Sequence, residues 1–210
     1  RQICEIFQDE HYKAGKIKKD MVILDVGANI GLASLYFKDW AKIIYALEPN
    51  HEYYQCLVEN TKNIPNIKTF NLAMSIFNGE DILIAMKDDP RAEAFYGNGD
   101  IREKVNCITF DKFFEDNKID HVDLLKIDTE GAEYPLFCSD GFRKVASKID
   151  FIVGESHYVD HFMPEFIPMM LKDAGFETRF EPIVNMFKKA SFFDKENGKM
   201  KEYQINLKTI

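Results

Sequence analysis

The sequence predicts an α/β fold, a mostly parallel sheet with helices on both faces. Two observations support this prediction. Short apolar runs of strand length recur along the chain, as at residues 21–24, 42–47 and 124–127. Most of these runs are followed by a turn or a carboxylate and then by a helical pattern, an alternation that is typical of βα units and a parallel sheet.

The first βα unit lies in the segment MVILDVGANIG. Residues 21–24 are apolar and too short for a typical helix, so they predict a buried central strand that ends near Asp25. Gly27 and Gly31 would let the backbone approach a ligand closely, and Asn29 is one of the few non-glycine residues that tolerates a positive φ. This segment therefore predicts a nucleotide-binding loop.

The spacing of this loop narrows the choice of cofactor. Dinucleotide-binding folds carry G-x-G-x-x-G, in which the second glycine faces a pyrophosphate, whereas this chain has G-x-x-x-G. A ligand that joins an amino-acid moiety to a nucleoside fits better, and S-adenosylmethionine (SAM) is such a ligand. An NAD-dependent oxidoreductase and a non-catalytic binding module on the same fold stay open as alternatives.

The second unit adds an acidic residue at the next strand end. Residues 42–47 (KIIYAL) predict a strand, and Glu48 follows it at the position where a carboxylate accepts hydrogen bonds from ribose hydroxyls. Pro49 and Asn50 suit a helix start, and a polar face continues to Asn60. We expect Glu48, Pro49 and Asn50 to contribute to the cofactor site.

The middle of the chain predicts less regular structure. A third strand is expected over residues 66–73 at the far side of the sheet, and a hairpin-like addition over 81–86. Residues 87–104 predict a lid loop, because they combine Pro, Gly and many charges with the aromatic pair Phe95 and Tyr96. A short strand over 105–109 and a small helix from Asp111 follow.

Two further strands end in polar residues. The strand at 124–127 leads into Asp128, and the strand at 149–153 leads toward Glu155 and His157. Ligands of open α/β sheets bind outside the carboxyl ends of the strands, so these side chains should converge with the glycine loop. Lys126 should share a strand face with Asp128 and form a buried ion pair near the cofactor.

The ends of the chain complete a single domain over residues 1–210. We expect an N-terminal helix and linker within residues 1–20, a helix over 164–174 and a strand over 175–180. A last strand over 203–209 follows a turn at Gly198, in an antiparallel closing hairpin. Because the sequence begins at Arg1, we expect it to be part of a longer polypeptide with neighbouring domains.

Composition excludes several partners. The net charge of -8 and pI near 5.2 disfavour nucleic acid, which is bound by clustered Lys and Arg. No apolar run approaches the roughly 20 residues of a membrane span, so a cytoplasmic protein without membrane contact is expected. The cysteines show no metal-ligand spacing and are expected to be reduced thiols. They are Cys4, Cys56, Cys107 and Cys138.

Three motifs together carry a family resemblance. DVGANIG, LEPN at residues 47–50 and LLKIDTEGAEY at residues 124–134 resemble the FkbM-type family of SAM-dependent methyltransferases. The resemblance implies a class I methyltransferase fold, a Rossmann-like sheet of seven strands with one antiparallel, and methyl transfer to an oxygen. It assigns the SAM loop to Asp25, Gly27, Asn29 and Gly31.

The same resemblance assigns Glu48 to the ribose, and Asp128 and Glu130 to the D-x-E-G element. We expect His157 to be the general base, because imidazole is active near neutral pH. Asp128 could instead bind the SAM ammonium group. Asp128 with Glu155 or His157 could also hold a divalent cation, magnesium or manganese, that lowers the pKa of the acceptor hydroxyl.

The acceptor is expected to be a hydroxyl on a sugar or glycan. Family members methylate sugars and hydroxylated natural products. The aromatic residues Phe95, Tyr96, Tyr158 and Phe162 could pack on a sugar ring, while Glu130 binds its hydroxyls. A polyketide or other small-molecule alcohol would use the same aromatic residues and stays open as the acceptor.

Overall fold

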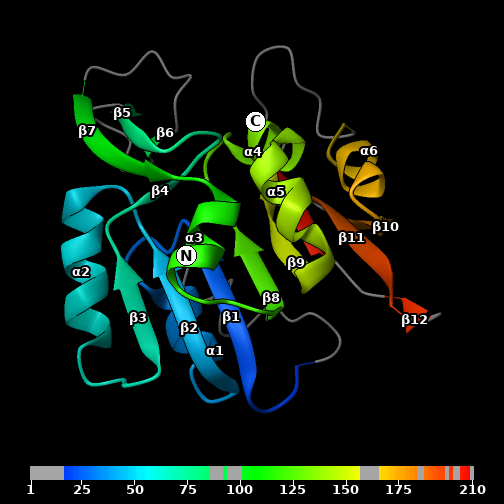
Figure 1. The fold of residues 1–210 in the computed structure, drawn as a ribbon, viewed down its shortest axis with the longest axis horizontal. Coiled ribbons are helices and arrows are strands. Elements are labelled where there is room, and N and C mark those ends of the chain that lie inside the picture. Colours follow the sequence, from blue (N-terminus) through cyan, green and yellow to red (C-terminus); the bar gives the residue numbers. More distant parts are fainter. Residues whose placement is uncertain are drawn as a thin grey trace.

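The predicted alternation of strands and helices is present in the computed structural model of the chain (Figure 1). The structure describes residues 17–85, 92–93, 101–156, 166–183, 187–196, 199–200 and 204–208. The helix expected within residues 1–20 falls mostly outside the described residues. Five predicted site or aromatic residues also lie outside them: Phe95, Tyr96, His157, Tyr158 and Phe162.

The central sheet contains nine strands rather than the expected seven. Its path runs through β10 (Phe176–Ile183), β11 (Phe187–Glu196), β13 (Gln204–Lys208), β9 (Ile149–Ser156), β8 (Val122–Ile127), β1 (Met21–Val26), β2 (Ala41–Leu47) and β3 (Ile67–Phe70). The short β12 (Lys199–Met200) pairs with β11. The two extra strands, β11 and β12, fall in a segment to which the sequence pattern assigned no strand.

Strand directions agree with a mostly parallel sheet. The neighbours from β13 to β3 pair in parallel, whereas β11 is antiparallel to both β10 and β13. The expected antiparallel closing pair is therefore present between β11 and β13, but β13 also extends the parallel part of the sheet beside β9. The α/β fold class is confirmed, and β3 lies at the edge as expected.

The register brings the ends of the central strands level with one another. Val26 of β1 pairs with Leu47 of β2 and with Ile127 of β8, and Ile127 pairs with Gly154 of β9. The loops that follow these strands consequently leave the sheet at the same edge, which is the upper edge in Figure 1.

A second, four-stranded sheet lies above that edge (Figure 1). Its order is β4 (Ala73–Met74), β7 (Ile101–Ile108), β5 (Gly79–Ala85) and β6 (Ala92–Glu93). The strand predicted over 66–73 is thus split, because β3 belongs to the central sheet and β4 to the second one. The lid expected over 87–104 is wrong at residues 92–93 and 101–104, which are strand; its remaining residues lie outside the described part.

Helices cover both faces of the central sheet. They are α1 (Leu32–Phe37), α2 (His51–Thr61), α3 (Phe110–Asp116), α4 (Glu133–Cys138), α5 (Asp140–Val145) and α6 (Phe166–Asp173), with a 3₁₀ turn at Ala146–Lys148. Figure 1 shows α3 in front of the sheet and α1 behind it.

Two hydrophobic clusters reflect these two faces. Ile23 packs with Phe37 of α1 and Leu57 of α2, whereas the next residue, Leu24, belongs to the cluster that contains Phe113 of α3. Successive residues of a strand point to opposite faces, so the apolar run at residues 21–24 of β1 is explained by burial on both sides.

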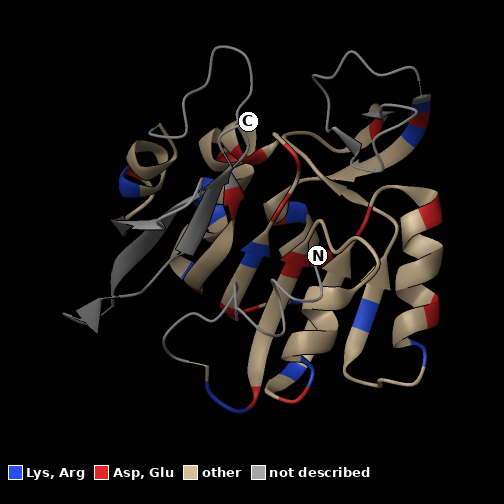
Figure 2. Ribbon diagram, turned by 180° about the vertical axis from the view of Figure 1, so that it is seen from behind, with Lys and Arg blue, Asp and Glu red and all other residues tan. Residues whose placement is uncertain are grey.

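The described surface carries mixed charge. Lys and Arg are scattered among Asp and Glu on the ribbon seen from behind, without a continuous basic stripe over the described residues (Figure 2). None of the described helices has the length and apolar character needed to cross a bilayer. Cys56, Cys107 and Cys138 are free thiols, and Cys4 lies outside the described residues.

Candidate functional site

The glycine loop leaves β1 in a series of left-handed conformations. Gly27, Asn29 and Gly31 have φ values of 75°, 50° and 91°, so the expectation that Asn29 takes a positive φ is confirmed. The amides of Gly27 and Ala28 both donate to the carbonyl of Leu47, at 3.0 and 2.8 Å. These bonds fix the loop against the end of β2.

Gly27 is required by the neighbouring chain segment. A Cβ atom at this position would lie 1.8 Å from the carbonyl oxygen of Asp128. The sequence-based reason for this glycine was close approach of a ligand. The structure gives a different one, since the loop after β1 and the loop after β8 meet here.

Glu48 ties the glycine loop to the end of β2. Its carboxylate is 5% exposed and accepts hydrogen bonds from the amide of Asn29 at 2.8 Å and the amide of Asn50 at 2.9 Å. Burial raises the pKa of Glu48 to about 7, although these two hydrogen bonds and the charge of Lys126 oppose the rise. A carboxylate offers about four acceptor positions, so this side chain retains capacity for further donors.

The pKa of Glu48 predicts how stability depends on pH. Between pH 4.5 and 7 the folded state keeps a proton that the unfolded chain has lost, so raising the pH through this window destabilises the fold. Urea unfolding without cofactor should show a loss of up to roughly 3 kcal/mol from this group. Glu48→Gln should remove that part of the loss. An identical pH profile in the variant would contradict the assignment.

The residues after Glu48 hold the turn in place. Asn71 donates from Nδ2 to the carbonyls of Glu48 and Pro49, at 2.9 and 2.8 Å. Asn50 caps α2 by accepting from the amide of Tyr53 at 3.0 Å, and its Nδ2 donates to Glu103 of β7. The predicted helix start at Pro49 and Asn50 is confirmed, and the side chain of Asn50 links α2 to the second sheet.

Asp25 and Lys126 form a buried ion pair beneath the glycine loop. The Asp25 carboxylate is fully buried, accepts from Ser34 Oγ at 2.7 Å and lies 3.3 Å from Lys126 Nζ. Lys126 Nζ also donates to the carbonyl of Gly27 at 2.6 Å and lies 3.9 Å from Asp128. The predicted ion pair is confirmed, and this geometry makes Asp25 a support for the loop from below.

Electrostatics keep this lysine charged. Burial by itself lowers the pKa of Lys126, but the carboxylates of Asp25, Asp128 and Glu155 outweigh that effect and raise it. The charged Lys126 therefore lies under the point where the loops after β1 and β8 meet. It attracts the Gly27 carbonyl of the first loop and the Asp128 carboxylate of the second.

The D-T-E-G loop after β8 is held by a residue that the sequence reasoning missed. The carboxylate of Glu133 is fully buried and accepts from the amide of Thr129 at 2.8 Å, the hydroxyl of Thr129 at 3.0 Å and the amide of Gly131 at 3.0 Å. An acidic residue in the first turn of a helix, just after a glycine, is the signal that could have found it.

The predicted catalytic carboxylates differ in exposure. The Asp128 side chain is 23% exposed at the end of β8, whereas Glu155 is 7% exposed and lies within β9 rather than after it. Glu130 lies in the same loop as Asp128, with a φ of 48°. Among the described residues Asp128 is thus the more accessible candidate.

The group best arranged for a metal ion in the described part of the chain lies elsewhere. His121, Asp123 and Asp150 place ligand atoms within 4.8 Å of one another, at the amino ends of β8 and β9. That is the opposite end of the strands from the glycine loop. Lys18 already pairs with Asp123 at 2.6 Å. The predicted metal ligands are Asp128 with Glu155 or His157, and His157 lies outside the described residues.

Comparison with known proteins decides the family. The profile described as "Methyltransferase FkbM domain" matches residues 25–178, well over half of the chain. The chain belongs to the FkbM methyltransferase family. It is therefore a SAM-dependent methyltransferase with a Rossmann-like fold, and the resemblance read from the three motifs is confirmed. No curated protein gives a significant match.

Solved structures show distant similarity. A precorrin-6y C5,15-methyltransferase from Geobacter metallireducens GS-15 is 14% identical, with 90% of this chain and 78% of that chain covered and a TM-score of 0.47. A putative RNA methyltransferase from Pyrococcus horikoshii is 15% identical over 97% and 79%, with a TM-score of 0.48. A SAM-dependent methyltransferase from Aquifex aeolicus is 13% identical over 84% and 85%, with a TM-score of 0.43.

Proposed function

We propose that this methyltransferase transfers the methyl group of SAM to a hydroxyl oxygen of a sugar or glycan. The observation that carries the proposal is the position of Asp128. Its partly exposed carboxylate stands at the end of β8, beside the glycine loop and 3.9 Å from Lys126. A hydroxyl acceptor must be oriented and must lose a proton, and hydrogen-bond acceptors are the groups that do this.

The residues present fit SAM. The positive φ values of Gly27, Asn29 and Gly31 turn the loop around the end of β1, and Glu48 stands at the adjacent strand end with acceptor capacity left for two ribose hydroxyls. We assign the ribose to Glu48 and the amino-acid part to the loop at residues 27–31. SAM supplies an electrophilic methyl group.

The chain supplies alignment and proton removal. We propose that Asp128 accepts a hydrogen bond from the acceptor hydroxyl and that Glu130 binds a neighbouring hydroxyl. His157 remains the proposed base, on the sequence argument that imidazole is basic near neutral pH. Alignment of two reactants is worth roughly 7 to 11 kcal/mol, which exceeds the contribution of a positioned base.

A divalent cation remains part of the proposal as a second mechanism. Asp128 and Glu155, with His157, would hold magnesium or manganese, which would lower the pKa of the hydroxyl. Loss of activity in EDTA with rescue by either ion would support this mechanism. Full activity in EDTA would favour the histidine base.

The acceptor class is tested by a panel. Purified protein with SAM would be assayed for S-adenosylhomocysteine release with deoxysugar glycosides, polyketide alcohols and catechols. We expect turnover with glycosides. Activity on polyketide alcohols or catechols, with none on any glycoside, would remove the sugar assignment and leave the methyltransferase assignment in place.

The variant Asp128→Asn tests the role that we propose for the Asp128 carboxylate. We expect turnover to fall by about 100-fold or more, because the amide is a poorer hydrogen-bond acceptor for the hydroxyl proton. Stability should change by roughly 1 kcal/mol or less, since the pair with Lys126 is 3.9 Å long and part-exposed.

The matched control is Asp140→Asn, because the Asp140 side chain is 90% exposed on α5. It should leave both turnover and stability unchanged. Calorimetry with S-adenosylhomocysteine separates the two roles of Asp128. Weaker cofactor binding that accounts for the whole loss of turnover would assign this carboxylate to the SAM ammonium group instead.

A further inference from the structure

An apolar cavity of about 220 Å³ lies between the second sheet and α4. Its apolar lining comes from the end of β4, the turn after it, and the start of α4: Met74, Ile76, Phe77, Ala132, Pro135 and Leu136. Two polar residues, Ser75 and Asp81, complete the lining. Pockets of this kind, mostly apolar with a few polar groups, are typical of small-molecule sites.

The cavity adjoins the proposed catalytic loop. Ala132 directly follows the D-T-E-G segment that begins at Asp128, so one wall continues the loop that holds the acceptor hydroxyl. One wall of the cavity, residues 74–77, follows β3, and the other wall, on α4, follows β8. Glu48, to which we assign the ribose, does not line the cavity, whereas the α4 wall begins next to the loop that carries Asp128. We therefore assign the cavity to the acceptor rather than to the ribose.

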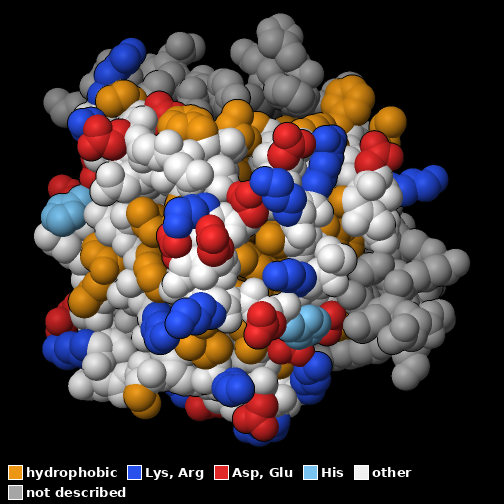
Figure 3. Space-filling view, in the orientation of Figure 1, with side chains coloured by type: hydrophobic (Ala, Val, Ile, Leu, Met, Phe, Trp, Pro, Cys, Tyr) orange, Lys and Arg blue, Asp and Glu red, His pale blue; other side chains and the backbone are white. Residues whose placement is uncertain are grey.

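Large apolar side chains on its lining are exposed to solvent. Ile76 is 54% exposed and Phe77 is 39% exposed. Hydrophobic side chains gather along the upper part of the face shown in Figure 3, where the second sheet and α4 meet. Exposed apolar surface at the edge of a pocket favours a ligand with an apolar part.

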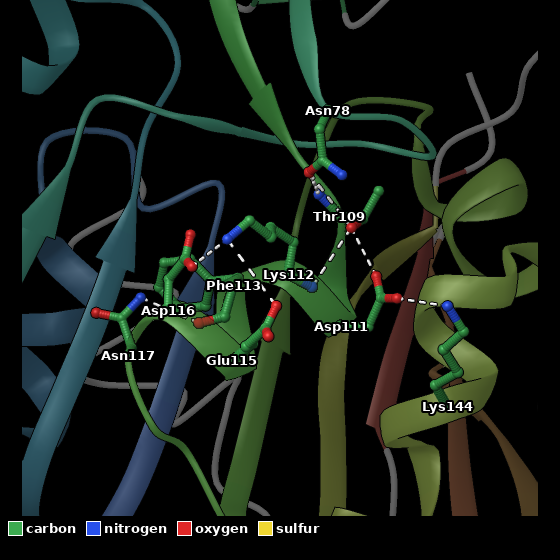
Figure 4. Close-up of polar contacts among 9 residues, drawn as sticks. All are labelled: Asn78, Thr109, Asp111, Lys112, Phe113, Glu115, Asp116, Asn117 and Lys144. Atoms are coloured by element: carbon green, nitrogen blue, oxygen red, sulfur yellow. Dashed lines mark hydrogen bonds and ion pairs between the residues drawn. The ribbon is translucent and has the colours of Figure 1, made fainter.

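The wall that carries these residues is fixed by polar contacts (Figure 4). Asn78 Oδ1 accepts from the amide of Thr109 at 2.9 Å, and Thr109 Oγ1 donates to Asp111 at 2.6 Å. Asp111 in turn pairs with Lys144 of α5 at 2.7 Å. The turn at residues 75–78 is thus tied to α3 and α5, which holds one wall of the cavity in place.

The volume suits a ring. A cavity of about 150 Å³ lined by apolar side chains holds benzene, so the larger cavity here can take a substituted six-membered ring or a branched alkyl group. Asp81 and Ser75 add hydrogen-bonding groups, which would suit a hydroxyl at the edge of the bound group.

We infer that this cavity binds the apolar part of an amphipathic acceptor, an aryl or branched alkyl group attached to the hydroxyl-bearing part. For a sugar acceptor this means a glycoside with an apolar aglycone, not a free sugar. The inference rests on the proposed function, because it assigns the cavity to the acceptor of that reaction.

A direct test uses the methyl group of Met74. In protein labelled with ¹³C at the methionine methyl groups and saturated with S-adenosylhomocysteine, phenyl β-D-glucopyranoside should shift the Met74 resonance through the ring current. Methyl β-D-glucopyranoside at the same concentration should leave it in place. Absence of a shift with the phenyl glycoside, or equal shifts with both glycosides, would overturn the inference.

The second test uses side chains that line the cavity. The double variant Ile76→Ala, Phe77→Ala should bind phenyl β-D-glucopyranoside about tenfold more weakly, because apolar contact is lost. Its affinity for S-adenosylhomocysteine should not change. The matched control Ile82→Ala removes an exposed isoleucine, 40% accessible, that does not line the cavity, and should bind both ligands as the wild type does.

The outcomes separate the two proposals. Weaker S-adenosylhomocysteine binding in the double variant would assign the cavity to the cofactor and overturn the inference. If no hydroxyl compound releases S-adenosylhomocysteine, the proposed function fails, and the Met74 measurement still decides whether the cavity takes an aryl group.

Discussion

Gly27→Ala is expected to destabilise the fold by roughly 3 to 5 kcal/mol and to abolish measurable cofactor binding. Two costs add at this position. The new Cβ would lie 1.8 Å from the carbonyl oxygen of Asp128, a backbone atom that cannot rotate away. The residue would also have to keep a φ of 75°, which L side chains rarely adopt.

The substitution should weaken cofactor binding because it displaces the glycine loop. Relief of the clash must separate the loops after β1 and β8, and the 2.6 Å bond from Lys126 to the carbonyl of Gly27 would be strained with them. Because the amides of Gly27 and Ala28 bind the carbonyl of Leu47, the end of β2 would move as well. Glu48 would then lose its position relative to the loop.

Gly175→Ala is the matched control for this prediction. Gly175 has a φ of 94°, but a Cβ there meets nothing within 4 Å. It should cost only the conformational part, roughly 1 to 2 kcal/mol. Urea unfolding and calorimetry with S-adenosylhomocysteine would compare the two variants. Equal destabilisation by both would show that the contact with Asp128 does not determine the effect.

The parts of the fold that could be predicted from sequence are those buried on both faces. The strands at Met21–Val26 and Val122–Ile127 are buried and mostly apolar, and such segments are distinctive even without a partner. The first residues of β7 and most of β11 are rich in charge, as in Arg102, Glu103 and Lys104. Such strands are stabilised by pairing with other strands, and the local sequence pattern does not identify these partners.

The same distinction applies to the site. The glycine loop and Glu48 could be proposed from sequence because each lies in the turn that follows a single strand. The sequence context of Glu133 indicates only an acidic residue in the first turn of a helix. Its hydrogen bonds to the loop depend on the path of the three residues before it, including a φ of 48° at Glu130, which the sequence does not show. The contact between Gly27 and Asp128 joins residues a hundred positions apart.

Lys126→Met is expected to cost roughly 3 to 5 kcal/mol, because it leaves the carboxylate of Asp25 buried without its cation. Lys126 is 3% exposed and Asp25 is fully buried, so water cannot replace the lost charge. The carbonyl of Gly27 loses its donor in the same step. By comparison, Lys104→Met removes an exposed partner of Glu80 and should cost less than about 1 kcal/mol.

A second substitution separates charge from packing. In Lys126→Met, Asp25→Asn the buried charge is gone, while Ser34 can still donate to the new amide oxygen, so most of the lost stability should return. Cofactor affinity should stay low in the double variant, because the cation that joins the Gly27 carbonyl to Asp128 is still missing. A double-mutant cycle would compare the wild type, the two single variants Lys126→Met and Asp25→Asn, and the double variant by urea unfolding and by calorimetry with S-adenosylhomocysteine. If affinity returns together with stability, Lys126 affects cofactor binding only through folding. If it does not, the lysine holds the glycine loop and Asp128 in the arrangement that we propose for cofactor binding.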